Sequence, residues 1–298
     1  MRFSKYHGTG NDFVLIEDLG DAAPVPPPRI AAICDRHLGV GADGLIRIVR
    51  GADAGADFFM DYWNADGSVA EMCGNGIRCL AKHVVDRGLA AGATTLRVAT
   101  RAGLKTLELD LEDGEVSRVT VDMGSPAFER RTLPMRGDPV STFVGEPWEA
   151  AGRTFPVATA LSMGNPHLVV FLGPDEDLGG LDVPGLGAAI ERSPAFPNGT
   201  NVEFVRPAPD GGLDMRVWER GSGLTMACGT GACATVVAHA RTAGGARTAD
   251  VRMPGGTVTV SWRQGGHVTL AGPATWVFDG ELSTEWLARI DEEARTAR

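Results

Sequence analysis

Two copies of one short phrase, CGNG at residues 73–76 and CGTG at residues 228–231, indicate how this 298-residue chain is built. The second copy begins 155 positions after the first (228 against 73), and each copy opens an Ala- and Val-rich stretch with helical spacing. Each cysteine is therefore expected at the N-terminus of a helix, where backbone N–H groups and the helix dipole stabilise a thiolate. The phrases predict two acidic thiols, one in each half of the chain.

Further segments repeat in the same order at nearly the same spacing, so the similarity extends well beyond the cysteines. They are NDFVLI at 11–16 with NPHLVV at 165–170, GLI at 44–46 with NVE at 201–203, and WN at 63–64 with WE at 218–219. A repeat of 20–50 residues would indicate a solenoid. A repeat of about 155 residues instead predicts two homologous domains, each large enough for its own core.

Alternating apolar and polar residues predict strands over most of the chain. The expected strands are residues 1–7, 12–17, 45–49, 57–63, 96–100, 104–111, 116–123, 154–161, 167–172, 201–205, 213–218, 251–253, 257–263 and 267–271, and the expected helices are 29–37, 76–87, 231–242 and 284–294. The two helices that follow the cysteines have small or apolar residues on most faces, so we expect them to be buried.

The predicted fold is α+β, with two homologous domains from an internal duplication. Each is expected to be a largely antiparallel or mixed sheet wrapped around a central helix, with the active site in the interdomain cleft. The N-terminal domain is assigned to residues 1–120 and the C-terminal domain to residues 121–264. Whether residues from about 265 to 298 pack back on the first domain stays open.

Composition and charge exclude several classes of function. Hydrophobic residues make up 43% and charged residues 22% of the chain, which is typical of a globular protein. A net charge of −10 argues against a nucleic-acid partner or an anionic membrane surface. No apolar run is long enough for a spanning helix, and the N-terminus lacks the apolar core of a signal peptide. Five cysteines in such a chain favour reduced thiols in the cytoplasm. Their spacings match no zinc site, and no metal is expected.

Two thiols on opposite faces of a tetrahedral carbon can invert it. One, as thiolate, removes a proton while the other, as thiol, delivers one from behind. If that carbon bears a carboxylate, the charge that develops on its oxygens is stabilised by backbone N–H groups at the helix ends, at residues 74–75 and 229–230. Cys34, Cys79 and Cys233 lie inside predicted helices and are interpreted as small buried hydrophobes.

The chain resembles the diaminopimelate epimerase family in many ordered segments. The segments are KYHGTGNDF at 5–13, GVGADG at 39–44, NADGS at 64–68, EMCGNG at 71–76, GNPH at 164–167, GTNVEF at 199–204, WERG at 218–221 and ACGTG at 227–231. The resemblance implies a cofactor-independent isomerase that interconverts LL- and meso-2,6-diaminopimelate without pyridoxal phosphate. It also implies a role in lysine and peptidoglycan precursor biosynthesis, a cytoplasmic location, a small-molecule substrate and a homodimer, although the sequence shows no exposed apolar stripe.

The resemblance also implies the site residues. Cys73 and Cys228 match the catalytic base and acid, and which acts as base in each direction stays open. The residues that match the substrate-holding set are Asn11, Asn64, Gly74, Asn75, Asn165, Asn201, Glu219, Arg220, Gly229 and Thr230. A substrate with two amino-acid ends suits this set, because Glu219 can pair with an ammonium group and Arg220 with a carboxylate. His167 is expected either to orient a thiol or substrate or to be a satisfied strand histidine. Some relatives carry a polar residue where Gly44 stands, so Gly44 is left out.

Four alternatives compete with this interpretation. Proline and hydroxyproline racemases share the paired-cysteine logic but would not need Glu219 and Arg220 for a second amino-acid end. A thiol–disulfide switch would explain both cysteines and none of the asparagines. A non-catalytic binding protein of the same fold would not need intact cysteines. A pyridoxal phosphate racemase needs a Schiff-base lysine, and the three lysines of the chain lie outside the repeated loops.

Overall fold

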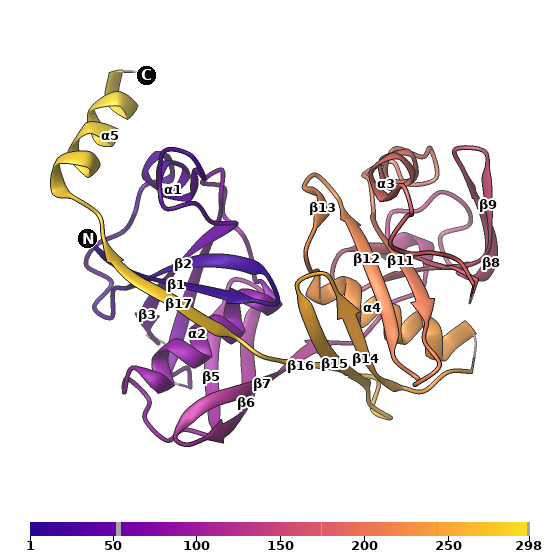
Figure 1. Cartoon of the computed structure of the whole chain (residues 1–298), viewed down its shortest axis with the longest axis horizontal. Coiled ribbons are helices and arrows are strands. Elements are labelled where there is room, and N and C mark those ends of the chain that lie inside the picture. The colour runs from indigo at the N-terminus through magenta and orange to yellow at the C-terminus, as the bar shows by residue number, and fades with distance from the viewer. Residues whose placement is uncertain (52–54, 174, 243, 297–298) are drawn as a thin grey trace. The chain divides into compact units, whose positions relative to one another are not determined.

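The chain folds into two compact units, seen in a computed structural model that describes residues 1–51, 55–173, 175–242 and 244–296. Unit 1 comprises Met1–Val121 together with Gly272–Arg298, and unit 2 comprises Asp122–Ala271. Each unit is a sheet curved around one helix, α2 (Gly74–Asp86) in unit 1 and α4 (Gly229–Thr242) in unit 2 (Figure 1). None of the helices in the described ranges is long and apolar enough to cross a bilayer.

Unit 1 is built from both ends of the chain. In chain order its other elements are β1 (Arg2–Gly8), β2 (Asn11–Glu17), α1 (Pro27–Cys34), β3 (Gly44–Arg50), β4 (Phe58–Asn64), β5 (Thr95–Thr100), β6 (Gly103–Glu112), β7 (Glu115–Gly124, which runs past the unit boundary), β17 (Thr275–Glu281) and α5 (Thr284–Thr296). The pairs β17–β1, β1–β2, β3–β4, β5–β6 and β6–β7 are antiparallel, while β2–β3 and β4–β5 are parallel. The sheet is therefore mixed, as expected.

Unit 2 repeats this plan. In chain order its elements are the 3-10 turn η1 (Arg130–Thr132), β8 (Phe143–Ala150), β9 (Arg153–Ser162), β10 (Pro166–Phe171), α3 (Val183–Glu191), β11 (Asn201–Pro207), β12 (Leu213–Glu219), β13 (Gly223–Thr225), α4, β14 (Thr248–Met253), β15 (Gly256–Trp262) and β16 (Val268–Gly272). The pairs β8–β9, β9–β10, β11–β12, β12–β13, β14–β15 and β15–β16 are antiparallel, and β10–β11 and β12–β14 are parallel.

Apart from the β12–β13 pair, the order of parallel and antiparallel pairs is the same in the two units, with one crossover helix (α1 or α3) and one central helix (α2 or α4) at the same places. This repetition confirms the predicted internal duplication. The repeat is not continuous in the chain, because β17 takes the place beside β1 that β8 takes beside β9. The first strand of the repeat is thus supplied in unit 1 by the C-terminal part of the chain.

The strand registers identify equivalent residues in the two units. Phe13 lies opposite Gly44 in unit 1, and His167 lies opposite Asn201 in unit 2. Two residues further along β3 and β11, the equivalents are Ile46 and Glu203. A buried apolar position of one unit is therefore occupied by a carboxylate in the other.

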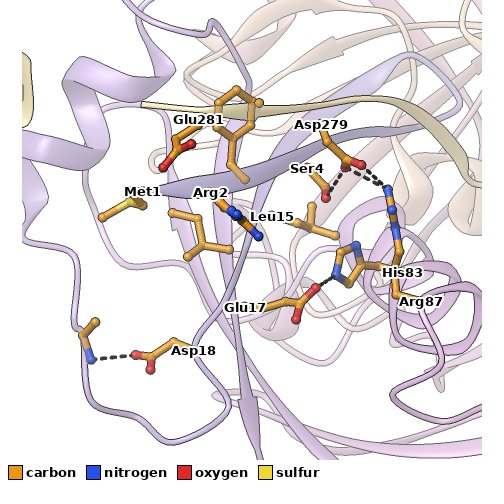
Figure 2. A pocket seen from close by; sticks show the side chains of 14 residues that line it. Met1, Arg2, Ser4, Leu15, Glu17, Asp18, His83, Arg87, Asp279 and Glu281 are labelled. Atoms are coloured by element: carbon orange, nitrogen blue, oxygen red, sulfur yellow. Dashed lines mark hydrogen bonds and ion pairs between the residues drawn. The ribbon is translucent and has the colours of Figure 1, made fainter. Parts of the chain in front are cut away.

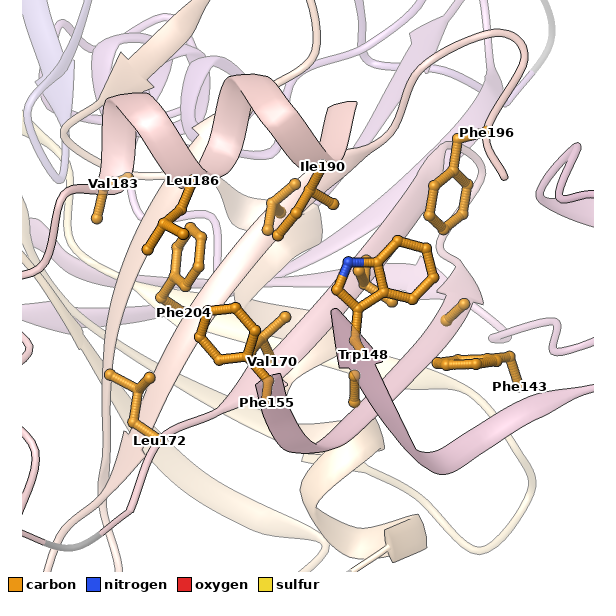
Figure 3. Close-up of a cluster of buried hydrophobic side chains, with 14 of the residues drawn as sticks. Phe143, Trp148, Phe155, Val170, Leu172, Val183, Leu186, Ile190, Phe196 and Phe204 are labelled. Carbon is orange, nitrogen blue, oxygen red and sulfur yellow. The ribbon is translucent and has the colours of Figure 1, made fainter. Parts of the chain in front are cut away.

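The core of unit 2 packs α3 against β11 and β12. Its members include the residues labelled in Figure 3 as Phe143, Trp148, Phe155, Leu186, Ile190, Phe196 and Phe204. The ring of Trp148 lies 5.6 Å from those of both Phe143 and Phe196, measured between centroids. These contacts remove large aromatic surfaces from water, which is the main stabilising contribution to such a unit.

The expected strands and all four expected helices are present, and both central helices are buried as predicted. The predicted end of the first helix, at residue 37, is wrong. That helix, α1, ends at Cys34 because Oδ1 of Asp35 accepts the backbone N–H groups of His37 and Leu38, at 2.8 and 2.7 Å. Such a side-chain turn competes with helix continuation.

Five elements of the described residues were not predicted from the sequence: η1, β8, α3, β13 and β17. The sequence of α3, VPGLGAAIE, contains two glycines and has low helix propensity. Its glycines permit close packing, since a Cβ on Gly187 would lie 2.5 Å from Trp218. Asp182 caps its N-terminus by accepting the N–H of Gly185. Packing and capping, rather than propensity, form this helix.

Candidate active site

The first cysteine segment forms the start of α2. Cys73 is the N-cap residue in extended conformation, and Gly74, Asn75 and Gly76 form the first buried turn. The first N–H groups of a helix have no partner within it, so this turn can bind negative charge. Cys73 itself is partly exposed. Unit 1 therefore presents an accessible sulfur beside a positive helix end.

Asn11 orients its amide toward this cysteine. Its Oδ1 accepts from Nδ2 of Asn75 at 3.2 Å and lies 3.5 Å from Sγ of Cys73. Its Nδ2 donates to Oδ2 of Asp43 at 2.6 Å. Because a carboxylate accepts only, Asp43 fixes which end of the Asn11 amide faces the thiol. Asp43 is a residue that the sequence analysis missed, although it lies in the GVGADG segment.

Asn64 lies at the end of β4 in a tight turn, where its Nδ2 donates to Oγ of Ser68 at 2.9 Å. It pairs in register with Gly44 of β3. A Cβ on Gly44 would lie 2.6 Å from the carbonyl oxygen of Trp63 and 2.7 Å from the ring of Tyr62. The backbone approach here therefore requires glycine, which explains why this chain carries no polar side chain at that position.

The second cysteine segment forms the start of α4, but its sulfur is in a different environment. Cys228 is only 5% exposed, and its Sγ accepts the backbone N–H of Gly231 at 3.4 Å and lies 3.5 Å from Oγ1 of Thr230. Burial, and then the nearby carboxylates of Glu219 and Glu203, raise the pKa of Cys228 well above its ordinary value. In this arrangement the thiol form of Cys228 is favoured over the thiolate.

Glu219 and Arg220 lie at and just after the end of β12. Glu219 accepts from Oγ1 of Thr225, and burial raises the pKa of this carboxyl. The backbone N–H of Arg220 donates to Oδ1 of Asn201 at 2.9 Å, and Nδ2 of Asn201 donates to the carbonyl of Pro166 at 2.9 Å. The buried Asn201 amide thus ties together the two loops that carry Asn165 and Arg220.

A chain of polar contacts runs from Cys228 into the sheet. Nδ2 of Asn165 donates to Oγ1 of Thr230 at 3.3 Å, and Oδ1 of Asn165 lies 2.9 Å from Nε2 of His167. The other ring nitrogen of His167, Nδ1, lies 2.7 Å from Oε1 of Glu203. Sequence analysis did not single out Glu203. The feature that could have indicated Glu203 is an acidic residue inside the otherwise apolar and continuously buried part of β11, NVEFV.

The chain is similar to known proteins over most of its length. Residues 3–129 and 159–277 match the family described as Diaminopimelate epimerase. The chain is 46% identical over 283 residues to the diaminopimelate epimerase of Pelotomaculum thermopropionicum. The alignment covers 94% of this chain and 98% of that one. It is 50% identical over 283 residues to that of Desulforudis audaxviator, covering 94% and 99%.

This chain belongs to the diaminopimelate epimerase family. The resemblance stated from the sequence is thereby confirmed. Solved structures with much lower identity share the fold alone. A probable proline racemase from Agrobacterium radiobacter has a TM-score of 0.69 at 14% identity, covering 95% of this chain and 93% of that one. A hydroxyproline epimerase from Agrobacterium vitis has 0.66 at 16%, covering 94% and 91%.

Unit 1 also contains a pocket that lies away from its cysteine segment. This pocket, of about 750 Å³, is lined by β1, β2, α2 and β17 (Figure 2). Its walls include the pair Glu17–His83, with Oε1 and Nε2 2.8 Å apart, and the pair Arg87–Asp279 at 2.6 Å. None of the residues matched to the family's site lines it. This pocket is therefore separate from both cysteine segments.

Proposed function

We propose that this chain interconverts LL- and meso-2,6-diaminopimelate by moving a proton between Cys73, Cys228 and one substrate carbon, without a cofactor. The observation that supports this most strongly is the duplicated fold, in which each unit starts its central helix with one cysteine. Membership of the epimerase family gives the substrate, and favours this activity over the proline racemase alternative.

In the proposed reaction, the thiolate of one cysteine takes the proton of the α-carbon, and the C–H electron pair moves into the adjacent carboxylate. The thiol of the other cysteine then gives its proton to the opposite face of that carbon and becomes the thiolate. Backbone N–H groups at Gly74–Asn75 and Gly229–Thr230 stabilise the carboxylate charge as it develops. Because the two cysteines exchange roles with the configuration of the substrate, the reaction runs in both directions.

The surrounding side chains are proposed to hold the two ends of the substrate. Asn11, Asn64, Asn75, Asn165 and Asn201 supply amide groups around the two cysteine segments. Glu219 is proposed to pair with an ammonium group, because its buried carboxylate would gain from a positive partner. The guanidinium of Arg220 is proposed to bind a carboxylate by two parallel hydrogen bonds.

The test is turnover of LL-diaminopimelate, followed as loss of optical purity and as uptake of deuterium at the α-carbon from deuterated water. Cys73→Ala and Cys228→Ala should each abolish epimerisation. Cys79→Ala is the matched control: it lies in the same helix as Cys73, and burial raises its pKa to about 12. Normal epimerisation by Cys228→Ala would contradict the two-thiol mechanism. Turnover of L-proline in place of diaminopimelate would contradict the substrate.

We propose further that the chain forms a homodimer through β17. The pairings described for this strand join it to β1 on one side. Its residues Trp276, Val277 and Phe278 are 48%, 49% and 43% exposed. Such an apolar strand edge is a pairing site unless another chain covers it. An apolar stripe was not expected from the sequence, because residues 275–281 show no clear alternation of apolar and polar residues.

Light scattering after gel filtration tests this proposal. The wild-type protein should elute as a dimer, and Phe278→Glu should shift it toward the monomer. Leu104→Glu, which changes a 55% exposed leucine of β6, is the control and should remain dimeric. A monomeric wild type, or a dimeric Phe278→Glu, would overturn it.

A cytoplasmic location is proposed from the five free cysteines, which suit a reducing compartment, and cell fractionation tests it.

A further inference from the structure

A fully buried polar pair lies beneath the second cysteine segment. His167 and Glu203 both have fully buried side chains, and their nearest atoms, Nδ1 and Oε1, are 2.7 Å apart. Within the described residues, Oε2 of Glu203 has no hydrogen-bond partner. Burying such groups costs free energy even when they are paired. The pair therefore needs an explanation beyond stability.

The duplicated fold shows that this architecture does not require the pair. The equivalent positions in unit 1 are Phe13 and Ile46, both completely buried and apolar. In each unit, the last glycine of the cysteine phrase faces the pair at this position. A Cβ on Gly76 would lie 2.8 Å from Ile46, and one on Gly231 would lie 2.6 Å from Oε1 of Glu203. One unit fills this space with hydrocarbon and the other with a carboxylate and an imidazole.

The contacts around His167 limit where its protons can lie. Nδ2 of Asn165 donates to Thr230, so the oxygen of the Asn165 amide faces Nε2 of His167, at 2.9 Å. The carboxylate of Glu203 faces Nδ1. With the amide in this orientation and Glu203 ionised, both partners are acceptors, and both ring nitrogens then donate. An imidazole that donates from both nitrogens is an imidazolium, and its charge balances that of Glu203.

We propose that Glu203 is a positioning residue of this site: it keeps His167 doubly protonated, and His167 in turn fixes the Asn165 amide with its NH₂ group toward Thr230 and the Cys228 loop. This inference rests on the proposed function. A neutral imidazole would have one accepting nitrogen, which would allow the Asn165 amide to turn over and present its oxygen to the loop instead. The imidazolium charge also opposes the effect of Glu203 on Cys228.

The proton arrangement can be measured without any activity assay. In ¹⁵N-histidine-labelled protein, both ring nitrogens of His167 should have the chemical shifts of protonated nitrogens at pH 8, with the signal assigned by its loss in His167→Gln. In Glu203→Gln, one of the two should move to the unprotonated range. Glu17→Gln is the matched control, because Glu17 bonds the other buried histidine, His83 (Figure 2). An unprotonated nitrogen on His167 in the wild type would overturn the inference.

Kinetics and stability then separate positioning from support of the fold. Glu203→Gln keeps the shape of the side chain and replaces the charge-assisted hydrogen bond with a neutral one, so the Tm should fall by only a few degrees. At the same time kcat/KM for LL-diaminopimelate should fall roughly ten- to hundredfold, the effect of losing a charge-assisted hydrogen bond. Part of this loss should be a higher KM, because Asn165 is proposed to hold substrate. Glu17→Gln should keep wild-type kinetics.

The double variant His167→Phe/Glu203→Ile transplants the apolar pair of unit 1. It should fold with a Tm at or above that of the wild type and lose at least as much activity as Glu203→Gln. Wild-type kinetics in the double variant would overturn the inference. If the wild-type protein did not epimerise diaminopimelate, the proposed function would fail, whereas the nitrogen shifts of His167 would still decide its protonation.

Discussion

The last glycines of the two cysteine phrases, Gly76 and Gly231, should respond very differently to alanine. Both lie in the first turn of a central helix, where alanine gains about 1 kcal/mol over glycine in helix propensity. At Gly76 the new methyl group would meet the ends of Ile46 and Met60, at 2.8 and 3.0 Å. At Gly231 it would meet Oε1 of Glu203 at 2.6 Å.

These contacts set the magnitudes. Side-chain ends can shift by a few tenths of an ångström, so overpacking at Gly76 costs about 1 kcal/mol, and Gly76→Ala should change the free energy of unfolding by less than about 1 kcal/mol. The carboxylate of Glu203 is held by His167, and moving it loses a charged hydrogen bond worth about 1.5–3 kcal/mol in addition to the overpacking. After the gain in propensity, Gly231→Ala should destabilise unit 2 by about 2–3 kcal/mol.

Thermal unfolding of the two variants measures this difference. For a unit of this size, about 2–3 kcal/mol corresponds to a fall in Tm of roughly 4–12 °C, against about 4 °C or less for Gly76→Ala. Glu203→Ala combined with Gly231→Ala should recover part of the overpacking cost, because the opposing oxygen is removed. Equal Tm values for the two single glycine variants would refute the placement of Glu203 against the α4 start.

Three further outcomes are expected. Asp43→Ala should lower kcat/KM for diaminopimelate about tenfold, since Asn11 loses the acceptor that fixes its amide, and steady-state kinetics measure it. Burial opposes ionisation of Asp12, but hydrogen bonds from Arg36 and Lys5 hold its pKa at about 2. Its stabilising effect, about 1–2 kcal/mol after allowance for solvent screening, should be complete above pH 4 and be lost between about pH 4 and 2 in acid unfolding. Leu287→Ala should destabilise unit 1 by about 2 kcal/mol, seen as a lower Tm, because Leu287 is the buried residue of α5. The kinetics should stay unchanged.

The fold was predictable where the sequence signal is local. The repeated phrase, the apolar stripes after it and the strict alternation of β5 and β14 each specify an element without knowledge of its neighbours. The same reasoning could not find α3, whose glycines lower its propensity and whose helix depends on packing against Trp218. It also could not find β17, whose side chains are nearly all exposed and therefore show no period of two.

The residues of the candidate site were likewise predictable only where the sequence signal is local. The cysteines and glycines of the loops follow from the sequence, because a helix start has a recognisable pattern. Asp43 and Glu203 act through Asn11 and His167, which lie 32 and 36 positions away in the chain. Such partners are set by the register of neighbouring strands, and a single sequence does not give that register. The pairing of residues 44–46 with 201–203 did indicate equivalence, yet its consequence, a carboxylate in place of an isoleucine, required the structure.

The two repeats offer the same helix end to a thiol and then surround it differently. Asn11 and Asn165 come from matched segments, but Asn11 is fixed by the carboxylate of Asp43, whereas Asn165 faces the ring of His167. Near Cys73 the amide presents its oxygen, an acceptor that suits a thiol. Beside Cys228 the amide presents its NH₂ group to Thr230, and Gly231 donates to the sulfur itself, an arrangement that suits a thiolate once the effect of burial is overcome. Because each cysteine is proposed to act as base in one direction and as acid in the other, each site has to accommodate both the thiol and the thiolate, and the two repeats do so with different neighbours. The duplication supplied two similar helix ends, and the residues that break their symmetry are those that the repeat does not share.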